Sequence, residues 1–454
     1  MNFSFDSFWV KKSRFDPNSF LNGHIESPAF VNLHPETLSD KMTTNRSIFS
    51  TFPNADELLN QYRAKNDKSV PHINGHIHTP HSFSAFNSIE QAFQLAKAEN
   101  ISVLGINDFY TTDGYDEFAA LAVKHKVFPL FNIEFMALQS HLQKAGVRVN
   151  DPSNPGRTYF SGKGLRQPAS MSNASFEKIK NLQLESNRQT YEMVDKLNDF
   201  MAEIRVGIIF DAKALQRRLA KNLFRERHIA QAVRIGVFSF YDEEIDRKRI
   251  LQKIFSGKEV KSPLDNFAAL ENEIRGNLLK AGGTAFVPED PKAFLSLDEV
   301  IELIVDAGGI PCYPVLLDDP KGVCTDYEAD KEKLLHELVK NDVYSIELIP
   351  GRNDFHILKD FVTYFHRNGF IITFGSEHNT PQLDPMKITC RGGVELDEEL
   401  KQICYEGTAV IAAHQYLVAN GKEGYLSGRK AKIGEKEYFV ELGKAVINKF
   451  ISPL

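Results

Sequence analysis

The chain has few cysteines and no long apolar run, and both shortages narrow what the protein can be. Its four cysteines, Cys312, Cys324, Cys390 and Cys404, include no Cys-x-x-Cys pair, so we expect reduced thiols. No stretch approaches the length of a membrane span, and the N-terminus lacks the apolar core of a signal peptide. The sequence therefore predicts a cytoplasmic protein that is not bound to a membrane.

An overall excess of basic residues is also missing. The formal net charge is −6 over 454 residues, so we expect no long nucleic acid as a partner. Binding of a small anion would require a local basic patch. With 42% hydrophobic residues, the chain is long enough to bury a large core and to form more than one domain.

The most informative stretch runs from His72 to Phe86, and its centre is His76-Ile77-His78. Side chains two residues apart on a strand point to the same face, so His76 and His78 can present their imidazoles together. Two imidazoles at a strand end form half of a metal site. On spacing alone, a histidine-rich loop that binds nothing is the alternative.

Strands and helices alternate after this stretch. Residues 101–106 and 127–135 are expected to form buried strands, and residues 115–126 a helix. This order is typical of a parallel sheet or barrel, whose functional residues lie at the carboxyl ends of the strands. Four candidate side chains occupy such ends: His76, His78, Asp108 and Glu134. Their common position favours one shared site.

The order of these motifs resembles the polymerase and histidinol phosphatase (PHP) family of metal-dependent phosphoesterases. The motifs that carry the resemblance are His76-Ile77-His78-Thr79 with Ser82, Asn107-Asp108-Phe109, Asn132-Ile133-Glu134 and Gly375-Ser376-Glu377-His378. Together with the alternating units, the resemblance predicts an α/β fold, a distorted parallel (β/α)7-type barrel with a helical insert. It implies metal ligands at His76, His78, Glu134, Glu377 and His378.

Several positions depart from the family pattern. The resemblance places Ser84, Phe109 and Tyr313 where family members carry ligands, and Tyr159 is the nearest match to another missing histidine. Phenylalanine cannot bind a metal, and neutral serine and tyrosine are weak ligands. We therefore expect one divalent ion, zinc, manganese or iron, with Phe109 and Tyr313 lining an apolar side of the pocket.

A basic segment lies within the helical insert. Residues 213–234 contain one acidic residue, Glu226, and seven lysines and arginines, and we expect one basic helix there. A solvated charged face is the alternative to an anion-binding role. One PHP branch, acting on nucleotides and RNA ends, carries an Arg-His-Ile-Ala-like motif over its active site. Here Arg227-His228-Ile229-Ala230 matches it, so the insert should cap the carboxyl ends of the strands.

Other candidate residues come from loops and strand ends. Residues 150–165 contain prolines and glycines that could bring Arg157 and Lys163 together around an anion, although an ordinary surface loop is the alternative. The expected substrate-binding cations are Arg157, Lys163, Arg225 and Arg227. The expected acid–base residues are Asp108, Asp113 and His228.

The resulting plan of the chain has five segments. They are an N-terminal extension (1–70), the first part of a PHP-like domain (71–175), the helical insert (176–289), the second part (290–395) and a C-terminal helical region (396–454). The resemblance implies a metal-dependent hydrolase, a phosphoesterase acting on a phosphorylated small molecule or nucleotide. A non-catalytic ligand-binding protein and a mononuclear metal lyase or isomerase are the alternatives. The sequence identifies neither the substrate nor the oligomeric state.

Overall fold

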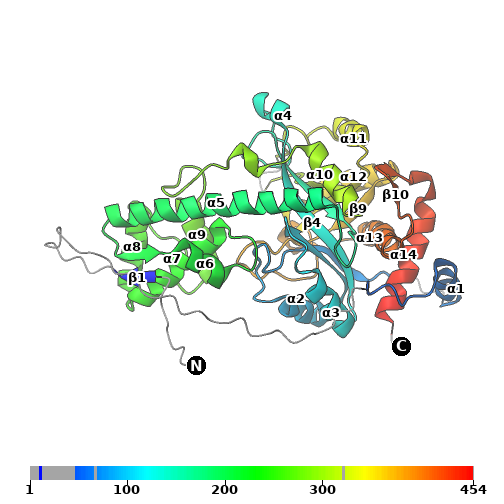
Figure 1. Cartoon of the computed structure of the whole chain (residues 1–454), viewed down its shortest axis with the longest axis horizontal. Coiled ribbons are helices and arrows are strands. Elements are labelled where there is room, and N and C mark those ends of the chain that lie inside the picture. The colour runs from blue at the N-terminus through cyan, green and yellow to red at the C-terminus, as the bar shows by residue number, and fades with distance from the viewer. Residues whose placement is uncertain (1–9, 13–45, 66–68, 320–322, 453–454) are drawn as a thin grey trace.

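A computed structural model describes residues 10–12, 46–65, 69–319 and 323–452. A barrel occupies the centre, helices of the insert lie toward one end of the long axis, and the C-terminal helices lie toward the other (Figure 1). Most of the expected N-terminal extension falls outside the described residues. The two elements described within it are β1 (Val10–Lys12) and α1 (Ala55–Lys65), of which α1 packs against the C-terminal helix α14 (Lys436–Ile451).

Seven strands form one nearly closed, mostly parallel sheet in the order β2-β3-β4-β5-β7-β8-β9. The strands are β2 (His72–Ile77), β3 (Ile101–Phe109), β4 (Phe128–Leu138), β5 (Arg157–Lys163), β7 (Ile310–Val315), β8 (Ser345–Leu348) and β9 (Ile371–Phe374). The predicted barrel class is confirmed.

The barrel closes where β2 meets the chain beyond β9. Ile77 forms a parallel bridge with Glu377, and His78 N donates to Glu377 O at 2.7 Å. Gly375 permits this approach, because a Cβ there would lie 2.2 Å from His76 Cβ. The seam therefore places the end of the last strand beside the histidine motif.

β5 runs antiparallel to β4 and β7, while the other neighbouring pairs of this sheet are parallel. The expectation of a loop that brings Arg157 and Lys163 together is therefore wrong, because these residues are the two ends of a strand. The local turn signals, Pro152, Pro155 and Gly156, belong to the connection that precedes the strand. They mark a turn but do not show where the next strand begins.

Helices cover the outside of the barrel. They are α2 (Ile89–Ala98), α3 (Tyr115–His125), α10 (Leu297–Asp306), α11 (Lys331–Lys340) and α12 (Phe355–Arg367), while the short α4 (Ser140–Lys144) after β4 has no buried residue. The longer ones turn an apolar stripe inward, and residues such as Phe93, Phe118 and Ile304 are fully buried there. The buried side chains of these helices and of the strands together form one continuous hydrophobic core.

The C-terminal region comprises α13 (Glu398–Ala419), the hairpin of β10 (Leu426–Ser427) and β11 (Lys430–Ala431), and α14 (Lys436–Ile451). α13 lies across the amino ends of the strands. The Gln415 side chain accepts from Phe131 N and donates to Pro129 O, at the start of β4. A Cβ on Gly407 would lie 2.1 Å from Ile372 O of β9. α13 therefore closes the end of the barrel opposite the carboxyl ends of the parallel strands.

The insert is built on α5 (Asn173–Glu203), which extends from the barrel (Figure 1). Its other elements are β6 (Ile208–Phe210), α6 (Ala212–Leu219), α7 (Glu226–Phe240), α8 (Glu244–Ile254) and α9 (Phe267–Leu278), and β1 pairs antiparallel with β6. These elements surround a second hydrophobic core that includes Val194, Val233 and Ile274. None of the described helices combines the length and apolar character that a membrane span requires.

The expected single basic helix is wrong, because residues 213–234 form α6, α7 and a six-residue connection. Within the connection, Leu223 is buried in the barrel core and Phe224 in the insert core. Leu223 N also donates to His81 O, in the loop after β2. Burial of neighbouring side chains in two different cores outweighs helix continuation and brings the start of α7 to the barrel.

Candidate metal centre

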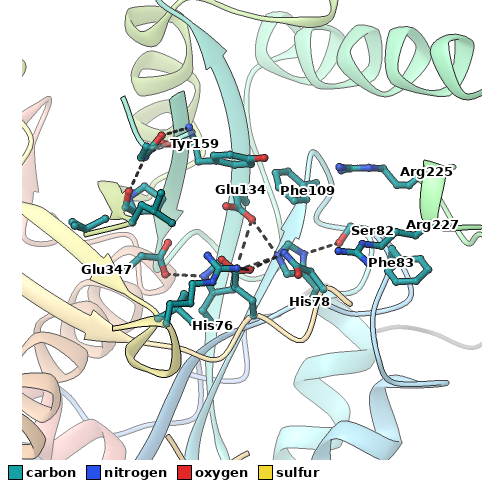
Figure 2. A pocket seen from close by; sticks show the side chains of 18 of the residues that line it. His76, His78, Ser82, Phe83, Phe109, Glu134, Tyr159, Arg225, Arg227 and Glu347 are labelled. Carbon is teal, nitrogen blue, oxygen red and sulfur yellow. Dashed lines mark hydrogen bonds and ion pairs between the residues drawn. The ribbon is translucent and has the colours of Figure 1, made fainter. Parts of the chain in front are cut away.

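A cavity of about 310 Å³ opens at the carboxyl ends of the barrel strands, between the barrel and the insert (Figure 2). Its floor carries His76, His78, Glu134 and Glu347, and its insert side carries Arg225, Arg227 and Arg275. Three strands supply the two histidines and two carboxyls: β2, which His78 directly follows, β4 and β8. The barrel therefore holds these groups on rigid elements rather than on free loops.

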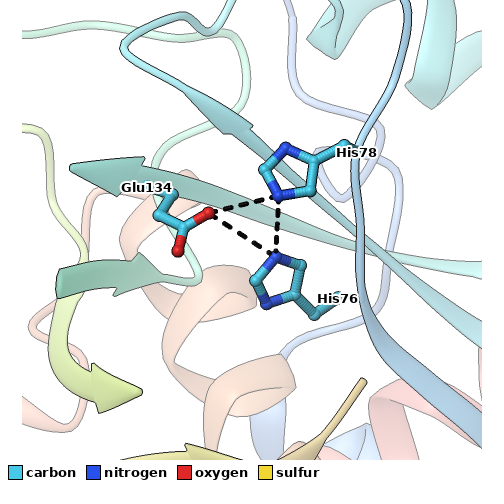
Figure 3. A group of neighbouring side chains, drawn as sticks. All are labelled: His76, His78 and Glu134. Atoms are coloured by element: carbon cyan, nitrogen blue, oxygen red, sulfur yellow. Dashed lines mark hydrogen bonds and ion pairs between the residues drawn. The ribbon is translucent and has the colours of Figure 1, made fainter. Parts of the chain in front are cut away.

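His76, His78 and Glu134 bring three potential ligand atoms together at the floor (Figure 3). His76 Nε2 lies 3.2 Å from His78 Nε2 and 3.8 Å from Glu134 Oε2, and His78 Nε2 lies 3.2 Å from the same oxygen. Ligands about 2.05 Å from a tetrahedral zinc ion would be about 3.3 Å apart. The three separations fit such an ion and leave one corner for another ligand.

Hydrogen bonds on the far side of each ring turn both Nε2 lone pairs toward this point. His76 Nδ1 donates to the Glu347 carboxylate at 2.9 Å. Ser82 Oγ donates to Asp108 at 2.6 Å, so it accepts from His78 Nδ1 at 3.0 Å. Both rings therefore carry a proton on Nδ1, the arrangement common in metal-ligating histidines.

The two buried carboxyls of the floor, Glu134 and Glu347, differ in how much positive charge lies close to them. Burial raises the pKa of Glu134 to about 8. Burial would also raise the pKa of Glu347, but the Lys163 ammonium at 2.6 Å and the His76 ring hold it well below its ordinary value. Among the described residues, only the two imidazoles lie within ion-pair distance of Glu134. A divalent cation would supply the positive charge that Glu134 lacks, so this group could hold a metal ion.

The other two expected ligands, Glu377 and His378, are placed differently from each other. Glu377 lines the same cavity, where its carboxylate pairs with Arg352. His378 turns away, because its Nε2 bonds to Asp384 O at 2.8 Å and its ring stacks on Phe86. The left-handed backbone of both residues, with φ of 63° and 52°, makes this sharp turn. The structure does not bring His378 to the three-residue group.

The carboxylates expected as general bases lie outside the cavity lining. Asp108 is buried under the turn after β2, where Thr79 N at 2.7 Å and the hydroxyls of Thr79 and Ser82 donate to it. Asp108 therefore supports His78 through Ser82. Asp113 is exposed and accepts from Asn222 in the connection before α7. It links the barrel to the insert instead of facing the floor.

His228 does not face the floor either. Its ring packs between Phe83 and Phe224, and burial lowers its pKa to about 3. Its Nδ1 accepts from Arg225 N at 3.0 Å, which caps the start of α7. A buried neutral imidazole with this bond supports the helix and has no access to a substrate proton.

Two of the four expected anion-binding cations are also engaged elsewhere. Lys163 is 1% exposed and pairs with Glu347 inside the barrel. Arg157 pairs with Glu289 at 2.8 Å and lines a neighbouring cavity of about 580 Å³. The sequence placed these two cations together, but the strand β5 separates them.

Arg225 and Arg227 reach the cavity from the start of α7 (Figure 2). The Arg225 guanidinium lies over the Phe109 ring, 4.8 Å from its centroid, and that of Arg227 lies over Phe83 at 5.6 Å. Phe109 stacks on His78 with 5.2 Å between ring centroids. One wall of the cavity is therefore aromatic and carries two cations.

The other aromatic residue expected on this wall, Tyr313, lies elsewhere. Its hydroxyl bonds to Glu328 at 3.1 Å, while the next residue, Pro314, lines the cavity. Alternation along β7 places these neighbours on opposite faces. Tyr159 of β5 does line the cavity.

Sequence reasoning missed Glu347, Arg275 and Arg352 as cavity residues. Glu347 had a usable signal, because it is an acidic residue within the short strand β8, whose four residues are all buried. A charge there must find a partner inside the barrel. Arg275 on α9 and Arg352 after β8 had no such signal, since cations on helices and loops are commonly solvated.

Comparisons with known proteins give no family for this chain. No family model matches it, and no curated protein matches it. One similar solved structure is a provisionally assigned metal-dependent phosphoesterase from Bifidobacterium adolescentis, with 16% identity, a TM-score of 0.45, and coverage of 74% of this chain and 96% of that one. Another is an amidohydrolase from Chromobacterium violaceum, with 16% identity, a TM-score of 0.46, and coverage of 70% and 93%. Likenesses this distant support no conclusion about the reaction of this chain.

Proposed function

We propose that this protein is a metal-dependent hydrolase, a phosphoesterase that acts on a phosphorylated small molecule. The observation that supports it best is one cavity with a three-residue ligand group on its floor and an incompletely compensated arginine, Arg227, on its wall. A metal and a cation on opposite sides of one space suit a substrate with a compact negative group.

Arg227 is the strongest sign of an anionic substrate. Burial, together with the nearby charges of Arg275 and Arg225, lowers its pKa to about 10. Its side chain donates to the neutral amide oxygen of Asn272 at 3.0 Å. By contrast, Arg225 and Arg275 share the Glu226 carboxylate, at 3.6 and 2.7 Å. An entering phosphate would supply the counter-charge that Arg227 lacks.

In this proposal, His76, His78 and Glu134 hold one zinc, manganese or iron ion. When bound, the ion supplies Lewis acidity to a phosphoryl oxygen and to an attacking water. Arg225 and Arg227 bind the other phosphoryl oxygens, and the aromatic rings beneath them keep the guanidinium planes in place. Phe109 offers no ligand for a second ion. This wall therefore favours a site with one metal.

Glu377 is the carboxylate that we assign to proton transfer in place of Asp108. It lines the cavity and stays ionised, because burial would raise its pKa but the Arg352 guanidinium that pairs with it keeps the pKa below the ordinary value. An ionised carboxylate at the wall can accept the proton that the attacking water releases.

Metal analysis tests the proposal directly. Wild-type protein purified with zinc or manganese should contain about one equivalent of metal and release phosphate from a panel of phosphate monoesters. The double variant His76→Ala/His78→Ala should lose both the metal and the activity. His378→Ala, a change at a nearby histidine outside the group, should keep the metal.

Two outcomes would contradict the proposal. Equal metal content in wild type and in the double variant would exclude this group as the site. One tightly held equivalent without hydrolysis of any ester would instead favour a ligand-binding protein with no catalytic role.

A further inference from the structure

The strand β5 lines the barrel interior with three polar side chains. Tyr159, Ser161 and Lys163 alternate along it and share one face. Tyr159 reaches the cavity, whereas Ser161 and Lys163 are 0% and 1% exposed. A lysine this deeply buried requires a specific partner, because an unpaired ammonium inside a protein is strongly disfavoured.

Lys163 enters the barrel from the end opposite the cavity. β5 is antiparallel to its neighbours, so its last residue lies beside the amino ends of the parallel strands, where a Cβ on the following Gly164 would lie 3.0 Å from the Ile411 side chain of α13. Lys163 pairs in register with Ile310, the first residue of β7, whereas Glu347 is level with Pro314, the fifth. The side chain must therefore extend up the barrel to reach Glu347, which suits the long stem of lysine.

Both Lys163 and His76 bind the same oxygen of Glu347. Lys163 Nζ lies 2.6 Å from Oε2, and His76 Nδ1 lies 2.9 Å from that atom. Ser161 Oγ donates to the other oxygen, Oε1, at 2.6 Å. Lys163 Nζ is also 3.3 Å from Oδ1 of Asn107, whose amide nitrogen lies 3.0 Å from His76 Nε2. The shorter of the two Lys163 contacts, the ion pair with Glu347, therefore links the ammonium to the ligand ring.

We propose that Lys163 is a positioning residue for the metal centre. It holds Oε2 of Glu347 in place from the side of the barrel opposite the cavity, and Glu347 in turn orients His76. The Nε2 lone pair of His76 then points at the position shared with His78 and Glu134. This inference rests on the proposed metal group, but it does not depend on which reaction the protein catalyses.

The competing explanation is that Lys163 and Glu347 form an ion pair that serves only the stability of the barrel. Under that explanation, removing the charge of Lys163 would lower thermal stability and leave metal affinity unchanged. Under our proposal, the affinity falls by about 10-fold or more, as is typical when a partner that orients a ligating histidine is lost.

The test compares Lys163→Met with Ser161→Ala. Lys163→Met keeps the length of the side chain and removes its charge, while Ser161→Ala removes a neutral donor from the other oxygen of Glu347. Zinc affinity, measured by chelator competition, should fall about 10-fold or more for Lys163→Met and much less for Ser161→Ala. Nitrogen NMR of the metal-free protein should show His76 as a single Nδ1–H tautomer in wild type and as a mixture in Lys163→Met.

A comparison of Glu347→Gln with the double variant Lys163→Met/Glu347→Gln tests the proposal even if Lys163→Met alone does not fold. If Lys163 acts through Glu347, then Glu347→Gln and the doubly neutral Lys163→Met/Glu347→Gln should bind zinc equally well. A further loss in the double variant would overturn the proposal, as would unchanged zinc affinity and unchanged tautomer in Lys163→Met. Because the NMR measurement needs neither metal nor substrate, a protein that proves inactive would refute the proposed function and still decide this inference.

Discussion

Arg227 is the residue whose loss should separate substrate binding from metal binding. It lines the cavity without touching the floor group, and its guanidinium has a neutral amide oxygen as its hydrogen-bond acceptor. A charge-assisted hydrogen bond is worth about 1.5–3 kcal/mol, so Arg227→Ala should raise KM for p-nitrophenyl phosphate by about 10- to 100-fold. Steady-state kinetics with the metal-loaded protein would measure this change, and metal content should stay at the wild-type value.

Arg217 offers a matched control for this substitution. It is an exposed arginine on α6 of the same insert, and it does not line the cavity. Arg217→Ala should leave KM within about twofold of wild type, because exposed charges far from a ligand contribute little. Equal increases in KM for both variants would mean that the insert attracts anions only through its overall charge.

For single residues, the sequence predicted the placements that strand geometry dictates and little else. His76, His78 and Glu134 could be grouped, because alternation sets the face and strand ends share an edge. His378 could not be placed, since one left-handed turn reverses the direction of a side chain and leaves no mark in local composition. His228 illustrates the same limit, because only the folded insert shows that its ring is buried and its Nδ1 already accepts a bond.

Among the elements, β5 and α13 show where pattern reasoning ends. The turn residues before β5 were recognised, but the strand direction depends on how the chain returns to the barrel, which no local signal records. Within α13, Leu400 and Ile411 are fully buried. Their spacing did not reveal that α13 is apolar enough to close an end of the barrel.

α13 also carries a buried histidine that makes stability depend on pH. His414 Nδ1 accepts from Tyr425 N at 2.9 Å and its Nε2 donates to Gly308 O at 2.7 Å. Burial lowers its pKa to about 4. In the unfolded chain a histidine titrates near pH 6.5, so between about pH 6.5 and 4 the unfolded state binds a proton that the folded state does not. The folded state therefore loses stability as the pH falls through this window.

His414→Gln should remove this contribution, because glutamine can accept and donate the same two bonds and stays neutral at every pH. The free energy of unfolding of wild type relative to this variant should decrease by about 3 kcal/mol between pH 7 and pH 4. Urea unfolding followed by circular dichroism at several pH values would measure the difference. If the difference in the free energy of unfolding between wild type and His414→Gln stayed constant across this pH range, the assignment of His414 as a neutral buried group would be wrong.

At the scale of the whole molecule, the residues that the structure describes form two hydrophobic cores, and we propose that the insert folds as its own unit. The buried residues of the second core all lie between Met193 and Val287, and apart from Leu223 the described insert residues beyond Met193 add none to the barrel core. The two chain ends of this unit meet, because Gln189 Nε2 donates to Val287 O at 2.8 Å. If the insert were removed between these two residues, a short linker could therefore join the remaining ends of the barrel chain.

Replacing residues 191–286 with a short glycine–serine linker should give a folded barrel that still binds one metal ion, because the floor group lies wholly outside the insert. The same protein should bind inorganic phosphate at least 10-fold more weakly, since Arg225, Arg227 and Arg275 leave with the insert. Calorimetric titration of the metal-loaded protein would measure this affinity, and full-length Arg225→Ala/Arg227→Ala/Arg275→Ala should match it. A folded deletion protein that loses its metal would show that the insert supports the floor, and unchanged phosphate affinity would show that the arginines do not bind the anion.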